Sequence, residues 1–250
     1  MAVYLLDPEK LKSQAERLHP QFVHGAPFPH IVMDDFIDEK LLDRVLEEFP
    51  SPHKLNWRKY NDTRQVKLAS EDESWFGPAT RELMLNLNSG ILIKFLESLT
   101  GIYGIFSDPH FRGGGLHQVE RGGSLKVHTD FNWYARLQAH RRLNLLLYLN
   151  KDWKDEYGGH LELWNKEMTK RYQQILPIFN RCVIFSTTDT SYHGHPEPLT
   201  CPEGMTRKSL ALYYYSATRP KEECSDPHST IFKKRPGEVW EDGEFRGRIT

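Results

Sequence analysis

Three histidines in this chain of 250 residues stand two positions before a carboxylate, in the segments 128–130, 160–162 and 195–197. Side chains at positions i and i+2 of a β-strand point to the same side, so each such pair can bind one metal ion together. The pattern alone is weak evidence, because composition predicts about 1.6 such pairs by chance in a chain with 12 histidines and 34 acidic residues. The neighbouring sequence must therefore decide which pair does chemistry.

The pair His128 and Asp130 has the most suitable surroundings. Strand-like sequence lies on both sides of it, and His193 follows after several further expected strands, which is far enough to return across a barrel. The two prolines that follow His195 predict a turn or an extended loop rather than a strand that presents two ligands. The pair at 160–162 lacks strand-like sequence upstream to complete a barrel. We therefore predict His128, Asp130 and His193 as metal ligands, with His195 as an open alternative to His193.

This set of ligands favours one kind of metal centre. Two histidines and one carboxylate cover one face of an octahedral Fe(II) ion and leave three positions for other ligands. A basic residue for an acidic ligand stands at Arg207, which begins a strand-like run that ends at Tyr215. By alternation Arg207, Ser209 and Ala211 share one face, and the small residues leave room for a carboxylate beside the guanidinium. Lys208 then points outward.

The composition argues for an ordered protein without a polyanionic partner. Lys and Arg number 33 against 34 acidic residues, and the formal net charge of −1 gives no electrostatic reason to expect a nucleic acid or a membrane surface. The aromatic content of 12% is too high for a disordered chain, and no apolar run is long enough to span a bilayer. The start of the chain lacks a signal-peptide pattern, and the cysteines at 182, 201 and 224 lack CxxC spacing. We therefore expect a reducing, cytoplasmic location.

The elements that must position these residues follow from the hydrophobic pattern. Within 142–150, leucines alternate with a mixed polar face, as in a barrel wall that lines a polar pocket. Glycine, asparagine and proline turns separate short strand-like runs, and this spacing predicts a barrel or a sandwich. The runs are 115–120, 124–130, 142–150, 160–165, 181–186 and 207–216.

The N-terminal third predicts a scaffold of strand and helix. Segment 29–37 resembles a strand, and Asp38 is a plausible N-cap for a helix that Pro50 stops. A second helix is expected from Pro78 to Leu99. We predict a single domain over residues 1–250. It comprises a helical and strand support at 1–114, a core at 115–216 and a C-terminal extension at 217–250. The sequence does not decide whether this extension is a lid, a flap over the barrel mouth or a packed extension.

Five segments in a fixed order resemble one enzyme family. They resemble the Fe(II)- and 2-oxoglutarate-dependent dioxygenases, in particular the prolyl 4-hydroxylase-like branch, over residues 115–216. Segment 29–49 is also similar to the entry region of bacterial members. The resemblance implies a mainly β fold with flanking helices around a double-stranded β-helix, or jelly-roll, core. The segments are 128–130, 147–153, 158–163, 192–194 and 207–213.

The resemblance implies roles for single residues. The three predicted metal ligands bind iron, and Arg207 pairs with the distal carboxylate of 2-oxoglutarate with support from Ser209. Tyr148 forms a hydrogen bond to this co-substrate, and Gln118 contacts its other end. The chain departs from the family in a longer interval between the last ligand and the arginine, which a turn-like insertion at 199–205 accounts for. The carboxylate at Asp130 favours hydroxylation, because the halide-binding variants of the family lack it.

The implied function is an oxygenase that hydroxylates an unactivated C–H bond, with a prolyl residue or a proline-like compound as substrate. It consumes O2 and 2-oxoglutarate at Fe(II) and releases succinate and carbon dioxide; a need for ascorbate stays open. The same chemistry on a small metabolite (another amino acid, a sugar or a natural product) is an alternative, and the oligomeric state stays open. Two readings from other classes are a cupin-like metal lyase or isomerase, which needs no Arg207 pocket, and a jelly-roll binding module without catalysis.

Overall fold

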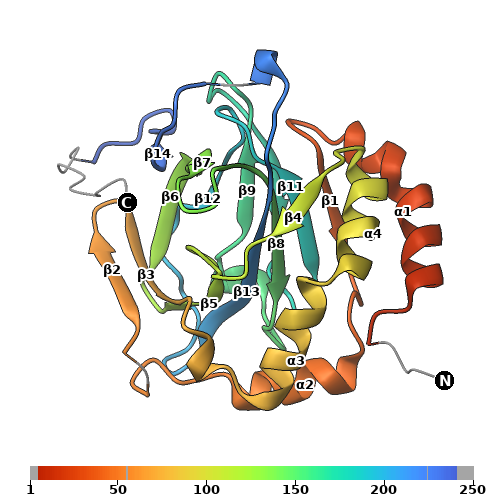
Figure 1. The fold of residues 1–250 in the computed structure, drawn as a ribbon. Helices are drawn as coiled ribbons and strands as arrows, with labels where there is room; N and C mark the ends of the chain where they lie inside the picture. Colours follow the sequence, from red (N-terminus) through yellow and green to blue (C-terminus); the bar gives the residue numbers. More distant parts are fainter. Residues whose placement is uncertain (1–4, 55, 224, 241–250) are drawn as a thin grey trace.

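The computed structural model describes residues 5–54, 56–223 and 225–240. These residues form one curled antiparallel sheet with four α-helices against it (Figure 1). The prediction of a mainly β fold with flanking helices is therefore confirmed. Cys224 and residues 241–250 of the predicted C-terminal extension lie outside the described residues. No helix among the described residues is long and apolar enough to cross a membrane.

The sheet follows the order β1-β11-β8-β13-β5-β3-β6-β12-β9-β10. Outside this order, β2 pairs with β3, β4 with β13, β7 with β8 and β14 with β6. The strands are β1 (His30–Met33), β2 (Arg58–Asp62), β3 (Gln65–Ser70), β4 (Ile105–Ser107), β5 (Gly115–Glu120), β6 (Ser124–Thr129), β7 (Trp133–Tyr134), β8 (Ala139–Tyr148), β9 (Leu161–Trp164), β10 (Arg171–Ile175), β11 (Cys182–Ser186), β12 (Tyr192–His195), β13 (Thr206–Ser216) and β14 (Ile231–Phe232). The helices are α1 (Pro8–Val23), α2 (Glu39–Glu48), α3 (Pro78–Leu87) and α4 (Gly90–Thr100), with short 3-10 turns η1 (Glu73–Trp75), η2 (Asp155–Tyr157) and η3 (Lys221–Glu223).

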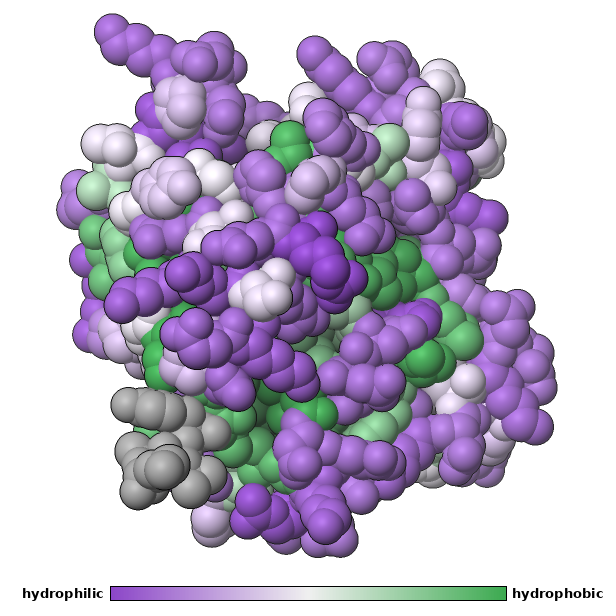
Figure 2. Space-filling model, turned by 90° about the vertical axis from the view of Figure 1, so that its right-hand side faces the viewer, coloured by the Kyte–Doolittle hydropathy of each residue, from purple (hydrophilic) through white to green (hydrophobic). Residues whose placement is uncertain are grey.

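The helices cover one face of the sheet, and that face carries the main core. Leu143, Leu145 and Leu147 of β8 are fully buried there with apolar residues of the helices, such as Leu83 and Leu96. Because side chains alternate along a strand, the polar residues between these leucines face the inside of the curled sheet. Figure 2 shows the outer side that carries α1, where hydrophobic residues appear only in limited patches among hydrophilic ones. The helices thus act as a support for β8 and leave the inner face free for a site.

The expected helix from Pro78 to Leu99 is in fact two helices. α3 ends at Leu87, and α4 starts anew after Ser89, whose hydroxyl accepts a hydrogen bond from the Leu92 amide at 3.5 Å. Serine is a favoured N-cap because its side chain satisfies an amide that has no partner within the helix. The apolar stripe continues across this break, so the hydrophobic pattern alone predicts one continuous helix.

The strand expectations hold for the core but miss several elements. β5 and β6 lie within the expected runs, whereas β8 begins earlier, at Ala139. The expected loop at His195 is wrong, because β12 continues to that residue and pairs with β6 on one side and β9 on the other. The strand ends directly before Pro196, which cannot donate a hydrogen bond to the ladder.

Candidate metal centre and its basic pocket

The three predicted ligands come together at one point on the inner face. His128 of β6 and His193 of β12 are direct partners in the strand register, and Asp130 follows at the end of β6. Their ligand atoms all lie within 4.8 Å of one another. Asp130 is 3.7 Å from the Nε2 atom of His128 and 3.5 Å from that of His193. This is the spacing at which two imidazoles and a carboxylate can share one metal ion.

Backbone carbonyls orient both rings for metal binding. The Nδ1 atom of His128 lies 2.8 Å from the carbonyl oxygen of Lys126, and that of His193 lies 2.9 Å from the carbonyl oxygen of Ser191. A carbonyl only accepts a hydrogen bond, so Nδ1 carries the proton and Nε2 keeps its lone pair. Burial lowers the pKa of His193 to about 4, so the ring is neutral at pH 7. The two histidines are therefore prepared as ligands through Nε2.

A buried polar group fixes the carboxylate. Asn144 donates a hydrogen bond of 2.8 Å to Asp130, and Arg141 lies 3.1 Å from the same Oδ2 oxygen. The Oδ1 oxygen of Asn144 also accepts from Arg141, at 2.7 and 3.0 Å. Burial alone raises the pKa of Asp130, but the charge of Arg141, together with both histidines, outweighs it and holds that pKa well below its usual range. Asp130 is therefore ionised and held in one orientation.

Arg141 and Asn144 are site residues that the sequence reasoning did not single out. The signal was present for Asn144, because it lies on the mixed polar face of the run 142–150 together with Tyr148. Arg141 lies just before that run, and its guanidinium stacks on the rings of Tyr213 and Phe131 at 3.4 and 4.5 Å from their centres. The sequence does not show this contact, because Tyr213 and Phe131 come close to Arg141 only in the folded protein.

The predicted basic pocket lies on the same inner face. Arg207 is buried, donates to the Gly159 carbonyl oxygen at 2.7 Å and lies 3.3 Å from the hydroxyl of Tyr148. Ser209 lies opposite Tyr148 in the strand register, so it shares this face. Among the described residues no acidic side chain forms an ion pair with Arg207. A buried guanidinium with no carboxylate partner from the protein suits an acidic ligand.

The placement of Gln118 corrects its predicted contact with 2-oxoglutarate. Gln118 lies opposite Lys208 in the register of β5 and β13, so its side chain is on the face away from Arg207. Its amide groups are occupied there, because it donates to the carbonyl oxygen of Pro50 and accepts from Thr206. The neighbouring His117 takes the inner face instead, opposite Ser209.

Two further basic residues on the inner face were not predicted. Lys67 of β3 has its pKa lowered to about 8, mainly by burial, and its ammonium lies 5.0 Å from the centre of the Tyr60 ring. His117 has its pKa lowered to about 3, first by burial and then by the charge of Lys67. These residues carry no recognisable motif in the sequence, and their role follows only from the strand register.

The competing histidine pairs serve other purposes. Glu162 is buried, and it accepts hydrogen bonds from Arg171 and Trp164. His160 lies 2.9 Å from Asp155. His195 is buried in β12 but is not part of the group of ligand atoms, so the structure favours His193 over His195 as the ligand.

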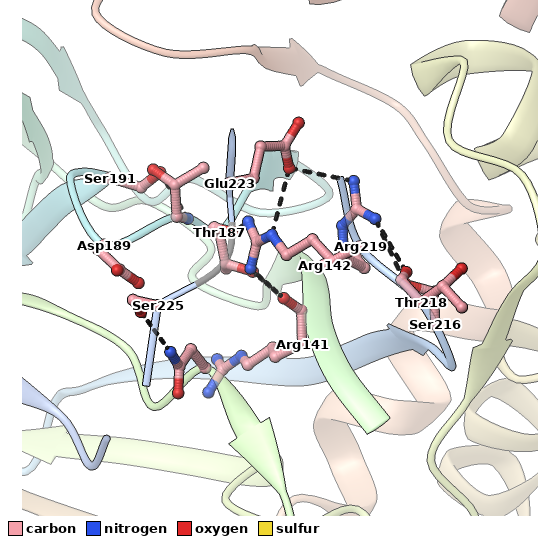
Figure 3. A network of polar contacts seen from close by, with 12 residues as sticks. Arg141, Arg142, Thr187, Asp189, Ser191, Ser216, Thr218, Arg219, Glu223 and Ser225 are labelled. Atoms are coloured by element: carbon pink, nitrogen blue, oxygen red, sulfur yellow. Dashed lines mark hydrogen bonds and ion pairs between the residues drawn. The ribbon is translucent and has the colours of Figure 1, made fainter. Parts of the chain in front are cut away.

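A C-terminal strap, residues 219–223 and 225–240, packs beside the metal centre. Figure 3 shows its first part, where Glu223 lies between Arg142 and Arg219 at 3.4 and 3.2 Å. Further along, β14 pairs with the end of β6, and the ring of Phe232 lies 5.4 Å from that of His128. The described part of the C-terminal extension is therefore a packed element that helps to enclose His128.

The donor set fits Fe(II). Two imidazoles and one carboxylate on a single face are the ligands that non-haem Fe(II) oxygenases use. The buried Arg207 beside them fits a ligand with a carboxylate. The arrangement can therefore hold a metal ion together with a small acid on the inner face of the sheet.

Comparisons with known proteins agree with this arrangement. Residues 114–215 match the model of the 2OG-Fe(II) oxygenase superfamily. A curated relative, the prolyl 3-hydroxylase OGFOD1 of Mus musculus, is 28% identical over 212 residues, which are 80% of this chain and 35% of the relative. This chain thus spans about a third of the relative's length.

Two solved structures share the fold. A prolyl hydroxylase of Trichoplax adhaerens, in complex with a peptide of the hypoxia inducible factor oxygen degradation domain, has a TM-score of 0.58 at 19% identity and covers 83% of this chain and 91% of its own. HygX of Streptomyces hygroscopicus, with nickel, 2-oxoglutarate and hygromycin B bound, has a TM-score of 0.51 at 12% identity and covers 81% of this chain and 92% of its own. The jelly-roll fold expected from the sequence is thereby confirmed.

Proposed function

We propose that the chain is a member of the 2OG-Fe(II) oxygenase superfamily, whose model matches residues 114–215, and that it hydroxylates an unactivated C–H bond of a prolyl residue in a peptide. The observation that carries the proposal is the group of His128, Asp130 and His193 on the same inner face as the buried Arg207. The prolyl substrate is supported by the curated relative, a prolyl 3-hydroxylase. A lyase or a binding module gives no reason for a buried arginine at this place.

The residues of the chain have distinct parts in this reaction. His128, Asp130 and His193 hold Fe(II), and Arg207 binds the distal carboxylate of 2-oxoglutarate together with Tyr148 and Ser209. Asn144 and Arg141 hold Asp130 in place, and the burial of His128 and His193 limits the access of water. Iron, 2-oxoglutarate and O2 together supply the oxidant that attacks the C–H bond, with succinate and carbon dioxide as co-products.

The setting of the reaction is also part of the proposal. We propose a reducing, cytoplasmic location, which is supported by Cys182 and Cys201, both free and buried. The near-neutral net charge supports a peptide or a small molecule as substrate rather than a nucleic acid or a membrane.

The first test is binding under anaerobic conditions. Addition of Fe(II) and 2-oxoglutarate should produce a visible charge-transfer band, and Arg207→Met should weaken 2-oxoglutarate binding by about ten-fold or more, because a charge-assisted contact is lost. Circular dichroism checks that the variant is folded. A folded wild-type protein without the band would contradict the oxygenase function.

The second test concerns the substrate. Succinate release should rise above the uncoupled level with prolyl peptides, and mass spectrometry should find one added oxygen on proline. Free proline, other amino acids, sugars and aminoglycosides serve as the comparison set. A response only to one of these would replace the peptide proposal with the small-metabolite alternative.

A further inference from the structure

Two basic side chains on β2 and β3 have no acidic partner. Lys67 is half-buried and Arg58 is exposed, and among the described residues neither side chain forms an ion pair or a hydrogen bond. Both lie over the ring of Tyr60, with the Arg58 Cζ atom and the Lys67 Nζ atom each 5.0 Å from its centre. We call these three residues the β2–β3 cluster. Two cations that share one aromatic ring keep their N–H donors available to an anion that reaches them from solvent.

The strand register places the cluster on the inner face of the sheet. Tyr60 lies opposite Lys67, and Arg58 lies opposite Ala69. Ala69 in turn lies opposite His117, which is on the inner face. Because residues two apart and directly opposite residues share a face, all three members of the cluster point inward. Among the described strands β2 pairs only with β3, so the cluster lies at the rim of the inner face (Figure 1).

The charge of Lys67 is felt at the metal centre and the basic pocket. Burial lowers the pKa of Lys67 to about 8, and the negative charge of Asp130 acts against this effect. The positive charges of Arg141 and Arg207 act in the same direction as burial. The ammonium is still mostly protonated at pH 7. The cluster is therefore a positively charged part of the surface that leads from the rim to the metal centre.

The acidic side chains that act on the cluster are bound elsewhere. Asp130 is fixed within the metal centre. Burial raises the pKa of Tyr60, and the charge of Glu71 acts in the same direction. Glu71 accepts a hydrogen bond of 2.7 Å from the Gly113 amide and lies 3.5 Å from Arg112. Neither carboxylate thus neutralises the cluster, and its charge is left for a ligand.

We propose that the β2–β3 cluster binds the side-chain carboxylate of an aspartate or a glutamate that lies close to the prolyl residue in the peptide substrate. The inference rests on the proposed function, since it names a further feature of the same substrate. A carboxylate between Lys67 and Arg58 accepts hydrogen bonds from both and removes the repulsion between the two cations. The location of the cluster on the inner face places this acidic residue near the proline rather than at a distant docking site.

The experiment measures peptide binding without turnover. Mn(II) replaces Fe(II), 2-oxoglutarate is present, and calorimetry gives Kd for short peptides that contain a single proline. A glutamate, a glutamine or a lysine occupies each position on either side of the proline in turn. At one position glutamate should bind about ten-fold more tightly than glutamine, and lysine should bind more weakly than glutamine. An increase in ionic strength from about 0.1 M to about 1 M should remove most of this preference, because salt screens charges at the rim.

Variants assign the preference to the cluster. Lys67→Met should abolish the preference for glutamate over glutamine, and Lys67→Glu should reverse it in favour of lysine peptides. Arg58→Met should reduce the preference. Lys59→Met is the matched control, because Lys59 lies between two members of the cluster on β2 and points to the other face. It should retain the full preference, and circular dichroism checks that each variant is folded.

The outcomes separate the inference from the proposed function. Equal affinities for glutamate and glutamine peptides at every position, in a wild-type protein that binds prolyl peptides, would overturn the inference and leave the function standing. A preference that survives in Lys67→Met would also overturn it. A loss of 2-oxoglutarate affinity in Lys67→Met without peptide would assign Lys67 to the co-substrate instead. If the wild-type protein bound 2-oxoglutarate but none of the peptides, the proposed peptide substrate would fail and the inference with it.

Discussion

His128 and His193 lie directly opposite each other in the antiparallel pair of β6 and β12. One backbone register thus sets both imidazoles, and their ring centres are 4.5 Å apart. Because a slip of one residue turns every side chain of a strand to the other face, the pairing of β6 with β12 is itself a condition for metal binding.

The first prediction concerns these two histidines. His128→Ala and His193→Ala should each weaken Mn(II) binding by more than about 100-fold, since the loss of mere supporting contacts around a metal already costs 10- to 100-fold. Electron paramagnetic resonance of free Mn(II) measures the affinity. His160→Ala is the control, and retention of tight binding in either of the first two variants would mean that the ligand set is wrong.

The second prediction concerns Asn144, which joins Arg141 to Asp130. Asn144→Leu keeps the volume but removes one of the two donors to the Oδ2 oxygen of Asp130, so that only Arg141 is left, and it also removes an acceptor from that buried guanidinium. We expect Mn(II) binding to weaken by about ten-fold and the free energy of unfolding to fall by about 1–3 kcal/mol. Titration with Mn(II) and urea unfolding measure the two effects.

Asn180→Leu is the matched control for this variant. Asn180 is also buried, and its side chain binds the backbone of Ile37 through both its amide groups, away from the metal centre. It should destabilise the protein at least as much, because Leu also meets strain at the φ of 62° that Asn180 adopts, and it should leave the Mn(II) affinity as it was. An equal loss of Mn(II) affinity in both variants would show that Asn144 acts only through stability.

The sequence predicted the part of the site that depends on alternation within one strand. His128 with Asp130 and Arg207 with Ser209 are pairs at i and i+2, and this spacing alone places their side chains together. The register between strands could not be read in the same way. Gln118 was expected inside, but the pairing of β5 with β13 brings it opposite Lys208 and turns it outward.

The elements that were missed have a common cause. β12 is only four residues long and contains two histidines and a glycine, so its strand character comes from pairing with β6 and β9 rather than from intrinsic propensity. The break between α3 and α4 is likewise set by the cap at Ser89, while the apolar stripe continues. Tertiary pairing and capping decided these positions, and a periodicity argument does not see them.

The third prediction is a pH dependence of stability in the metal-free protein. Burial lowers the pKa of His117 to about 3 in the folded state, against about 6.5 in the unfolded state. Between these values the unfolded state binds more protons, so the stability from this group is complete above about pH 6.5 and is lost as the pH falls toward 3. At pH 5 the contribution of His117 should be about 2 kcal/mol smaller than at pH 7.5.

Urea unfolding of the wild-type protein and of His117→Leu at both pH values measures this difference. The variant has no group to protonate at this position, so its stability should change less with pH, by about the same 2 kcal/mol. Equal pH dependence in both proteins would show that His117 is accessible to protons in the folded state.

The last prediction concerns the contact of the C-terminal strap with the metal centre. Phe232 packs its ring at 5.4 Å from the ring of His128, and the amide of Lys233 donates to the Val127 carbonyl oxygen at 2.8 Å. Phe232→Ala should expose the ring of His128 to water on this side. It should therefore raise the rate of Mn(II) release by about three-fold or more, because an apolar shell around a metal site limits solvent access. Ile231→Ala is the control, because Ile231 is 41% exposed. Stopped-flow transfer of Mn(II) to a chelator measures the rate, and equal rates in the two variants would show that the strap does not protect the site.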